Sequence, residues 1–192
     1  MIDERTETRI LSTLAAETAP RESLWGILDG ARDASIFGKV ETARRQCCLY
    51  AGALPWQLQM TAPYLVELPV DAFTRSLLRA GWGNSWGIFF LSEAPMETLR
   101  RHLRTFLRVA DQRGRYLIFR YYDPRVMRVY LPTCQPSELR AVFGPIRCYL
   151  MESPLGDTLL RFSRRNEVLE ASSLPIAQTG TDPDAGDSRR TN

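Results

Sequence analysis

The 192-residue sequence contains one histidine, His102, and one lysine, Lys39. A single histidine cannot supply an imidazole cluster, and the four cysteines lack the paired CxxC spacing of a zinc site. No apolar run approaches the roughly 20 residues that a helix needs to cross a bilayer, and the N-terminal residues have no apolar core behind a basic start. We therefore expect no metal, no cofactor and no membrane contact, and a cytoplasmic location.

Basic side chains slightly outnumber acidic ones, and all but Lys39 are arginine. The chain has 25 Lys and Arg against 22 Asp and Glu, which gives a net charge of +3. Two origins of the arginine bias stay open, a GC-rich genome or a surface that prefers bidentate contacts with acidic partners. Neither a strongly basic domain nor a nucleic-acid motif is present, so we expect no nucleic-acid partner. With 44% hydrophobic residues, the chain can bury one sizeable core.

Segments of strand and helix periodicity alternate along the chain, which predicts an α/β fold, a mixed sheet with helices packed on it in a single domain. We divide the chain into an N-terminal helical segment (1–23), an α/β domain (24–168) and a polar C-terminal tail expected to be disordered (169–192). Strands are predicted at residues 24–30, 46–50, 64–68, 87–91, 115–122, 146–151 and 158–162, and helices at 7–18, 33–45, 71–80, 95–110, 124–131 and 136–143.

The helix predicted from Pro95 has two distinct faces. One face collects apolar residues at helical spacing, namely Met96, Leu99, Leu103, Phe106 and Ala110. On the other face Arg101, Arg104 and Arg108 recur as helix neighbours and would form a basic ridge. This ridge is either a solvated helix face or a docking surface for a partner.

The segment FRYYDPRV, residues 119–126, combines strand and helix-start signals. Bulky residues alternate on both faces of residues 115–122, which predicts a strand in the middle of the sheet. Asp123 is the expected N-cap of a short helix, and Pro124 stands at its first position, where a missing N–H has no cost. The residues of this helix expected to face the core are Val126, Val129 and Tyr130.

Cysteine chemistry is expected to play no part in the fold or function. Cys47 and Cys48 are neighbours on a predicted strand and point to opposite faces, which argues against a disulfide framework. We expect the four cysteines to be reduced core residues. His102 could in principle pair with one of them as a nucleophile, but a packing or capping histidine is the simpler interpretation.

Two further patterns raise an enzymatic alternative. The glycine loop GWGNSWG, residues 81–87, lies between a helix and a strand and lacks the Gly-Lys-Ser/Thr of a phosphate loop. Asp29 and Asp123 each follow a predicted strand, where open α/β sheets place ligand sites, and Arg120 and Arg125 could join them in a cleft. The structural interpretation of these four residues is an N-cap with ion pairs that fix the loops.

Several short segments together carry a family pattern. They are residues 28–31 (LDGA), 49–52 (LYAG), 62–66 (APYLV), 86–89 (WGIF) with Ser92, 99–107, and 119–131 with FRYYDPRV. In this order they resemble the adaptor (effector chaperone) proteins of the bacterial type VI secretion system, the domain-of-unknown-function 4123 family. The structural signature of this resemblance comprises Asp29, His102, Arg120, Asp123, Pro124 and Arg125.

The resemblance implies a cytoplasmic protein that is not an enzyme. Such a protein recognises the N-terminal region of a cognate effector and helps to place it on the spike complex of the VgrG/PAAR type, with contact to the spike itself left open. Many relatives carry a helical extension after this domain, whereas this chain continues into a short polar segment. That departure leaves open whether one surface can engage effector and spike together.

A docking hypothesis follows from the ridge and the aromatic loops. Effector segments would pack on exposed Trp56 and Trp82, while Arg101, Arg104 and Arg108 steer them and contact the rim. Residues 120–125, by contrast, should organise a junction at the sheet edge and stabilise the fold.

Overall fold

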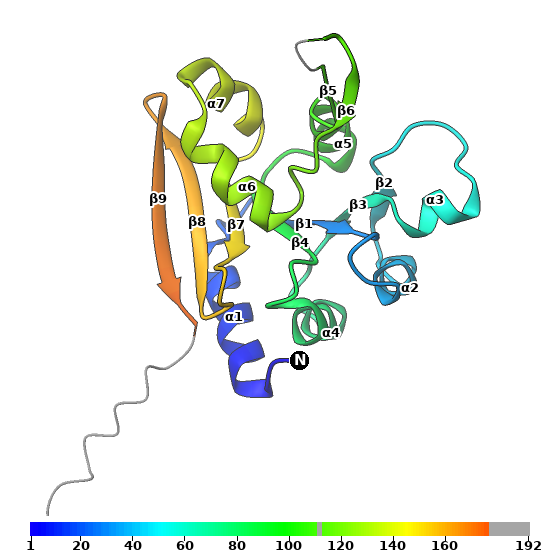
Figure 1. Cartoon of the computed structure of the whole chain (residues 1–192). Coiled ribbons are helices and arrows are strands. Elements are labelled where there is room, and N and C mark those ends of the chain that lie inside the picture. Colours follow the sequence, from blue (N-terminus) through cyan, green and yellow to red (C-terminus); the bar gives the residue numbers. More distant parts are fainter. Residues whose placement is uncertain (111–112, 177–192) are drawn as a thin grey trace, which may run out of the picture.

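A seven-stranded antiparallel sheet organises the chain (Figure 1). The computed structural model describes residues 1–110 and 113–176. In spatial order the strands are β2 (Gln46–Cys48), β3 (Pro63–Glu67), β1 (Ser23–Asp29), β4 (Gly87–Ser92), β7 (Cys148–Glu152), β8 (Thr158–Arg165) and β9 (Val168–Pro175). Two further strands, β5 (Arg108–Ala110) and β6 (Tyr116–Ile118), pair only with each other among the described residues. The predicted α/β class is confirmed.

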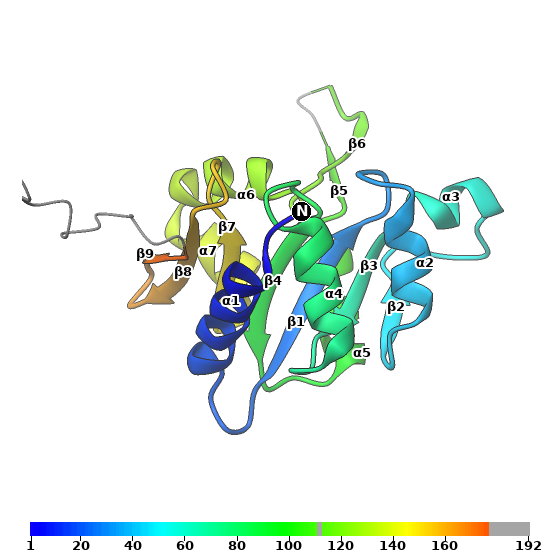
Figure 2. The ribbon, with the colours of Figure 1, turned by 90° about the horizontal axis from the view of Figure 1, so that it is seen from below.

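Helices cover both faces of the sheet. One layer consists of α1 (Glu4–Glu17), α2 (Ser35–Glu41) and α4 (Ala72–Gly81), which lie side by side across the sheet in Figure 2. The other layer consists of α5 (Met96–Arg104), α6 (Pro124–Tyr130), the 3-10 turn η1 (Leu131–Thr133) and α7 (Pro136–Phe143). A short helix, α3 (Trp56–Met60), lies in the β2–β3 connection.

Strand alternation divides the interior into two apolar cores. On β1, Leu24 and Leu28 pack under α1, α2 and α4, whereas Trp25 and Ile27 face α5, α6 and α7. A strand buried on both faces is the reason that β1 reads as a continuous apolar run, with β4 beside it in the same position. Because α1 supplies Ile10 to the first core, residues 1–23 belong to the same folded unit as the rest of the domain.

Local capping explains where several helices begin. The Asp3 carboxylate accepts the Thr6 amide at 2.8 Å at the start of α1, and Asp71 accepts the Thr74 amide at 3.1 Å at the start of α4. The α7 helix begins with a capping box between Gln135 and Glu138. The helices predicted at residues 7–18, 71–80 and 136–143 are confirmed as α1, α4 and α7, although α1 begins at Glu4, earlier than predicted.

The prediction of a mid-sheet strand at residues 115–122 is wrong. Only Tyr116–Ile118 is a strand, and it forms a two-stranded ribbon with Arg108–Ala110 that stands out from the sheet in Figures 1 and 2. The predicted helix 95–110 correspondingly ends at Arg104. Apolar residues that alternate on both faces give the same pattern whether a strand is buried on both sides or exposed on both sides, and here they are exposed.

The predicted core face of α6 needs a correction. Val129 is exposed, Val126 and Tyr130 are partly buried, and the buried residues of this helix are Pro124 and Met127. A helix of seven residues presents barely two turns, so a small rotation about its axis changes which residue faces the core.

The predicted start of the disordered tail, at residue 169, is too early. Residues 168–175 form β9, which pairs along its whole length with β8 through a two-residue turn at Asn166 and Glu167, both with positive φ. Six of the eight residues of this edge strand are exposed, and its polar composition gave the misleading signal. Residues 177–192 of the predicted tail lie outside the described residues. Over residues 1–110 and 113–176 no helix is long and apolar enough to cross a membrane.

Candidate functional site

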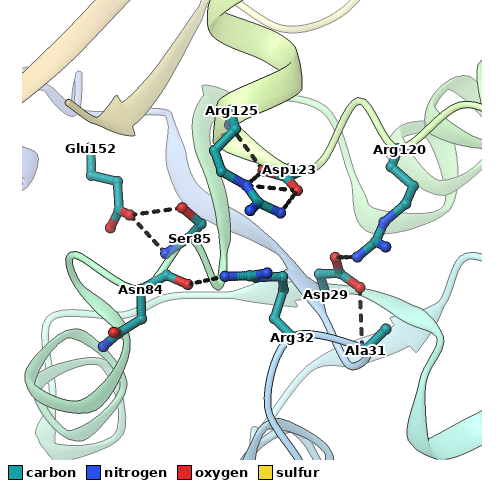
Figure 3. Close-up of polar contacts among 9 residues, drawn as sticks. All are labelled: Asp29, Ala31, Arg32, Asn84, Ser85, Arg120, Asp123, Arg125 and Glu152. Carbon is teal, nitrogen blue, oxygen red and sulfur yellow. Dashed lines mark hydrogen bonds and ion pairs between the residues drawn. The ribbon is translucent and has the colours of Figure 1, made fainter. Parts of the chain in front are cut away.

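Three acidic residues meet at one end of the sheet (Figure 3). Asp29 ends β1 and Glu152 ends β7, and because both strands are antiparallel to β4 they finish where β4 begins, at Gly87. Asp123, at the start of α6, lies over the same end. We call this set, with Arg32, Arg120 and Arg125, the junction.

Asp29 is held by two contacts. Its side chain is buried, forms an ion pair with the Arg120 guanidinium through Oδ2, and accepts the Ala31 amide at 3.1 Å through Oδ1. The hydrogen bond to Asp29 raises the pKa of Arg120, which also lies 6.0 Å from the centre of the Tyr122 ring. Asp29 therefore fixes the β1–α2 turn and ties it to the segment that follows the β5–β6 ribbon.

Asp123 caps α6 and pairs with the first basic residue of that helix. Its Oδ1 accepts the Arg125 amide at 2.9 Å, and its Oδ2 accepts Arg125 Nη2 at 2.6 Å. Burial works to raise the pKa of Asp123, but the hydrogen bonds from Arg125 outweigh it, so the pKa lies below its usual value. The expected N-cap role of Asp123 and the first-position role of Pro124 are confirmed.

The glycine loop, residues 81–87, binds the Glu152 carboxylate. The amides of Gly83 and Ser85 donate to its carboxylate at 2.6 and 2.7 Å, and both residues have positive φ. Burial raises the pKa of Glu152, although these amide bonds oppose the shift. Because the loop amides at 83 and 85 already bind a carboxylate of the same chain, the structure gives no support to a phosphate-binding interpretation of GWGNSWG.

Sequence reasoning missed part of the junction. Arg32 donates to the Asn84 carbonyl at 3.1 Å, and Arg128 donates to the Glu152 carbonyl at 2.6 Å. Glu152 could have been found, since it directly follows a predicted strand, as Asp123 does. Arg32 and Arg128 carried no such signal, because their partners are backbone carbonyls of distant segments.

Both aspartates of the junction are engaged in ion pairs. An aspartate that acts as a general base needs a carboxylate free to accept a proton, with a pKa near the working pH. Asp29 and Asp123 are instead each bound to a guanidinium, and the pKa of Asp123 is lowered. Hollows of about 360 and 410 Å³ in the described surface lie elsewhere, beside α2 and β2 and beside the α1–β1 connection.

The His102 and cysteine side chains serve packing. His102 Nε2 lies 3.1 Å from the Val142 carbonyl oxygen, its ring packs edge-on against Phe106, and burial lowers its pKa. All four cysteines are free; Cys148 is buried and the other three are partly buried. Burial raises the pKa of Cys47 to about 11, so this thiol is protonated at neutral pH. Among the described residues, no cluster of His, Cys, Asp and Glu could hold a metal ion.

The residues predicted to bind an effector separate into different environments. Trp82 is buried, stacks on Phe89 and donates from Nε1 to the Gly156 carbonyl at 2.6 Å, so it is not an exposed docking aromatic. Trp56 is exposed on α3, edge-on to Phe37. Arg101 and Arg104 lie on α5, but Arg108 lies on β5, so the three do not form a ridge on a single helix.

Comparison with known proteins places the chain in a family. No curated protein and no solved structure matches it. Residues 24–141 match the family described as a domain of unknown function, DUF4123, a span that runs from β1 to α7 and includes most of the junction and the β5–β6 ribbon. Since this match covers more than half of the chain, the protein belongs to the DUF4123 family.

Proposed function

We propose that this protein is an adaptor of a type VI secretion system. It binds the N-terminal region of a cognate effector in the cytoplasm and helps to load that effector onto the spike complex. Membership of the DUF4123 family supports this proposal, because the resemblance in segments 28–31 through 119–131 points to effector adaptors.

The observation that carries the proposal is the exposed apolar ribbon. Large apolar side chains on β5 and β6 face solvent on an element that stands out from the sheet. Exposed apolar residues gathered in one place indicate a protein-binding surface, whereas scattered ones do not. An adaptor needs such a surface and does not need a catalytic cleft.

The alternative is a small α/β enzyme that uses Asp29 and Asp123 with Arg120 and Arg125. The ion pairs of both carboxylates favour a structural role for these residues. The two functions differ in a simple respect. An adaptor binds one polypeptide in fixed stoichiometry, whereas an enzyme turns over a small molecule without a stable protein partner.

The test is affinity purification of the tagged full-length chain from its own host, followed by mass spectrometry and light scattering of the eluted complex. We expect a polypeptide with a toxin-like or spike-tip architecture in an amount close to equal with the adaptor, and a single complex of defined mass. Recovery of the chain alone at low salt would contradict the adaptor function and return attention to Asp29 and Asp123.

A further inference from the structure

The β5–β6 ribbon is firmly mounted at its base. The Phe119 amide donates to the Leu107 carbonyl at 3.0 Å, which continues the ribbon towards the core, and the Phe119 ring packs edge-on against Tyr130 at 4.8 Å. The buried Tyr121 hydroxyl donates to the Leu103 carbonyl at 2.9 Å. The Asp29–Arg120 ion pair adds a link to β1. These contacts, together with the Asp29–Arg120 pair of the junction, hold the base of the ribbon in a defined position.

Both faces of the ribbon are apolar and open to solvent. Val109 pairs with Leu117, and in the alternating register these two side chains share one face while Tyr116 and Ile118 share the other. The exposed fractions are 70% for Tyr116, 50% for Leu117, 60% for Ile118 and 40% for Val109. A two-stranded ribbon gains little stability in water by itself, so these side chains are better explained by a surface that a partner covers.

Among the described residues, three arginines on α5 and β5 have no acidic partner. Ten other arginines of the described chain form ion pairs with carboxylates, for example Arg75 and Arg79 with Glu7 and Arg147 with Glu22. Within residues 1–110 and 113–176, no carboxylate lies within ion-pair distance of Arg101, Arg104 or Arg108. The Arg108 guanidinium instead lies 4.8 Å from the centre of the Tyr116 ring, so this arginine is part of the apolar surface of the ribbon. Arg101 and Arg104 precede the ribbon on α5.

We propose that the β5–β6 ribbon is the effector-docking element, and that its occupant is an acidic segment of the effector with apolar side chains. The apolar side chains cover Tyr116, Leu117 and Ile118, while the carboxylates pair with Arg101, Arg104 and Arg108. This inference rests on the proposed adaptor function and specifies the surface and the chemistry of its partner. It keeps the arginines of α5 in the docking site, adds the ribbon and removes Trp82, which is buried.

Photo-crosslinking in the host locates the docking surface even when the effector has not been identified. The photoreactive residue p-benzoylphenylalanine replaces Leu117 on the ribbon. In matched controls it replaces exposed Val70, in the β3–α4 connection, or exposed Val168, on β9. We expect a crosslinked product much larger than a dimer of this chain from position 117 only. A product of twice the chain mass would identify a self-association surface and overturn the docking proposal, as would effector crosslinks confined to positions 70 or 168.

Affinity measurements test the chemistry of the partner. The probe is the purified N-terminal fragment of the polypeptide recovered with the wild-type chain, titrated against Leu117→Ser/Ile118→Ser and against the control Val70→Ser/Val168→Ser. All four positions are exposed, so both double variants should fold. We expect the ribbon variant to bind at least about tenfold more weakly and the control to bind like the wild type.

A second pair of variants tests the charged part of the surface. In each variant three arginines are replaced by glutamate. The test variant changes Arg101, Arg104 and Arg108, and the control changes Arg5, Arg21 and Arg164, which are exposed elsewhere in the described chain. We expect weaker binding and a smaller salt dependence only for the test variant. Suppose the wild-type chain captures an effector, and this effector binds the Leu117→Ser/Ile118→Ser variant and the triple glutamate variant as tightly as the wild type. The docking inference then fails and the adaptor function stands. If no effector is captured, both fail.

Discussion

The Asp29–Arg120 ion pair should respond unequally to removal of its two partners. The Asp29 side chain is 1% exposed, whereas the Arg120 side chain is 42% exposed. Asp29→Asn leaves a guanidinium that water can solvate, and the asparagine oxygen can still accept the Ala31 amide. Arg120→Met leaves a carboxylate that is buried and without its counter-charge. The second change should therefore destabilise the fold more than the first.

The magnitudes follow from the burial of the remaining group. Loss of one partner of a buried ion pair costs about 3–5 kcal/mol, and we assign the lower part of that range, about 3 kcal/mol, to Arg120→Met because Arg120 itself is partly exposed. For Asp29→Asn we expect about 1–2 kcal/mol, the loss of one charge-assisted hydrogen bond partly replaced by water. At about 2–4 °C of melting temperature per kcal/mol for a chain of this size, the two variants should differ by several degrees.

Urea unfolding followed by tryptophan fluorescence measures both free energies, with circular dichroism for the melting temperature. Glu93→Ala, at an exposed carboxylate, is the control and should be close to wild type. The double variant Asp29→Asn/Arg120→Met completes a mutant cycle, in which we expect a non-additive term. Equal and small effects of both single changes, with additivity in the double variant, would refute the structural role of the pair.

Three further predictions concern Glu152, His102 and Gly87. Burial raises the pKa of Glu152 above its usual 4.5, so the contribution of Glu152 to stability is present below pH 4.5 and is lost as the pH rises through the raised pKa. In urea titrations, the unfolding free energy of wild type minus that of Glu152→Gln should fall from about pH 4 to about pH 7. Burial lowers the pKa of His102 below its usual 6.5, so the contribution of His102 to stability is present above pH 6.5 and is lost as the pH falls from there through the lowered pKa. Thermal melts of wild type but not of His102→Gln should show this loss, and a parallel pH response of the two proteins would contradict it. A Cβ atom at Gly87 would lie 2.0 Å from the Ile27 carbonyl oxygen, a backbone atom that cannot yield, so Gly87→Ala should sharply reduce soluble yield and melting temperature, whereas Gly38→Ala, with open space around it on α2, should be neutral or stabilising.

The sequence predicts best where local chemistry and burial point the same way. Asp123 and Pro124 fix the start of α6, and the predicted helix at residues 136–143 coincides with α7, whose start the structure stabilises with a capping box of four residues. The buried strands β1 and β4 are equally legible, since continuous apolar runs of that length fit a strand covered on both faces.

The sequence predicts poorly where the outcome depends on distant partners. Residues 116–118 have the pattern of a buried strand, but within residues 1–110 and 113–176 no layer covers them and they are exposed. Trp82 stands in a glycine-rich loop, as exposed aromatics often do, yet it is buried because the β7–β8 turn at Gly156 closes over it. Strand β9 exists through its pairing with β8, which a polar composition does not reveal.

For the junction, the sequence predicts which residues take part but does not predict their role. Asp29 and Asp123 could be selected from the sequence because they follow strand patterns, and the structure places both at one end of the sheet with Arg120 and Arg125 as their partners. Their role could not be decided in the same way. Whether a carboxylate at a strand end is free or paired depends on side chains from other segments, and here both are paired.

Quantitative affinity purification of three chains from the host tests the central claim most directly. Wild type, Leu117→Ser/Ile118→Ser and Val70→Ser/Val168→Ser would be tagged, expressed at equal levels and compared by mass spectrometry of the co-eluting proteins. We predict one large polypeptide in near-equal amount with the wild type and the control, and its depletion with the ribbon variant. The same polypeptide in equal amount with all three chains would contradict docking at the ribbon, and its absence from the wild type would contradict the adaptor function.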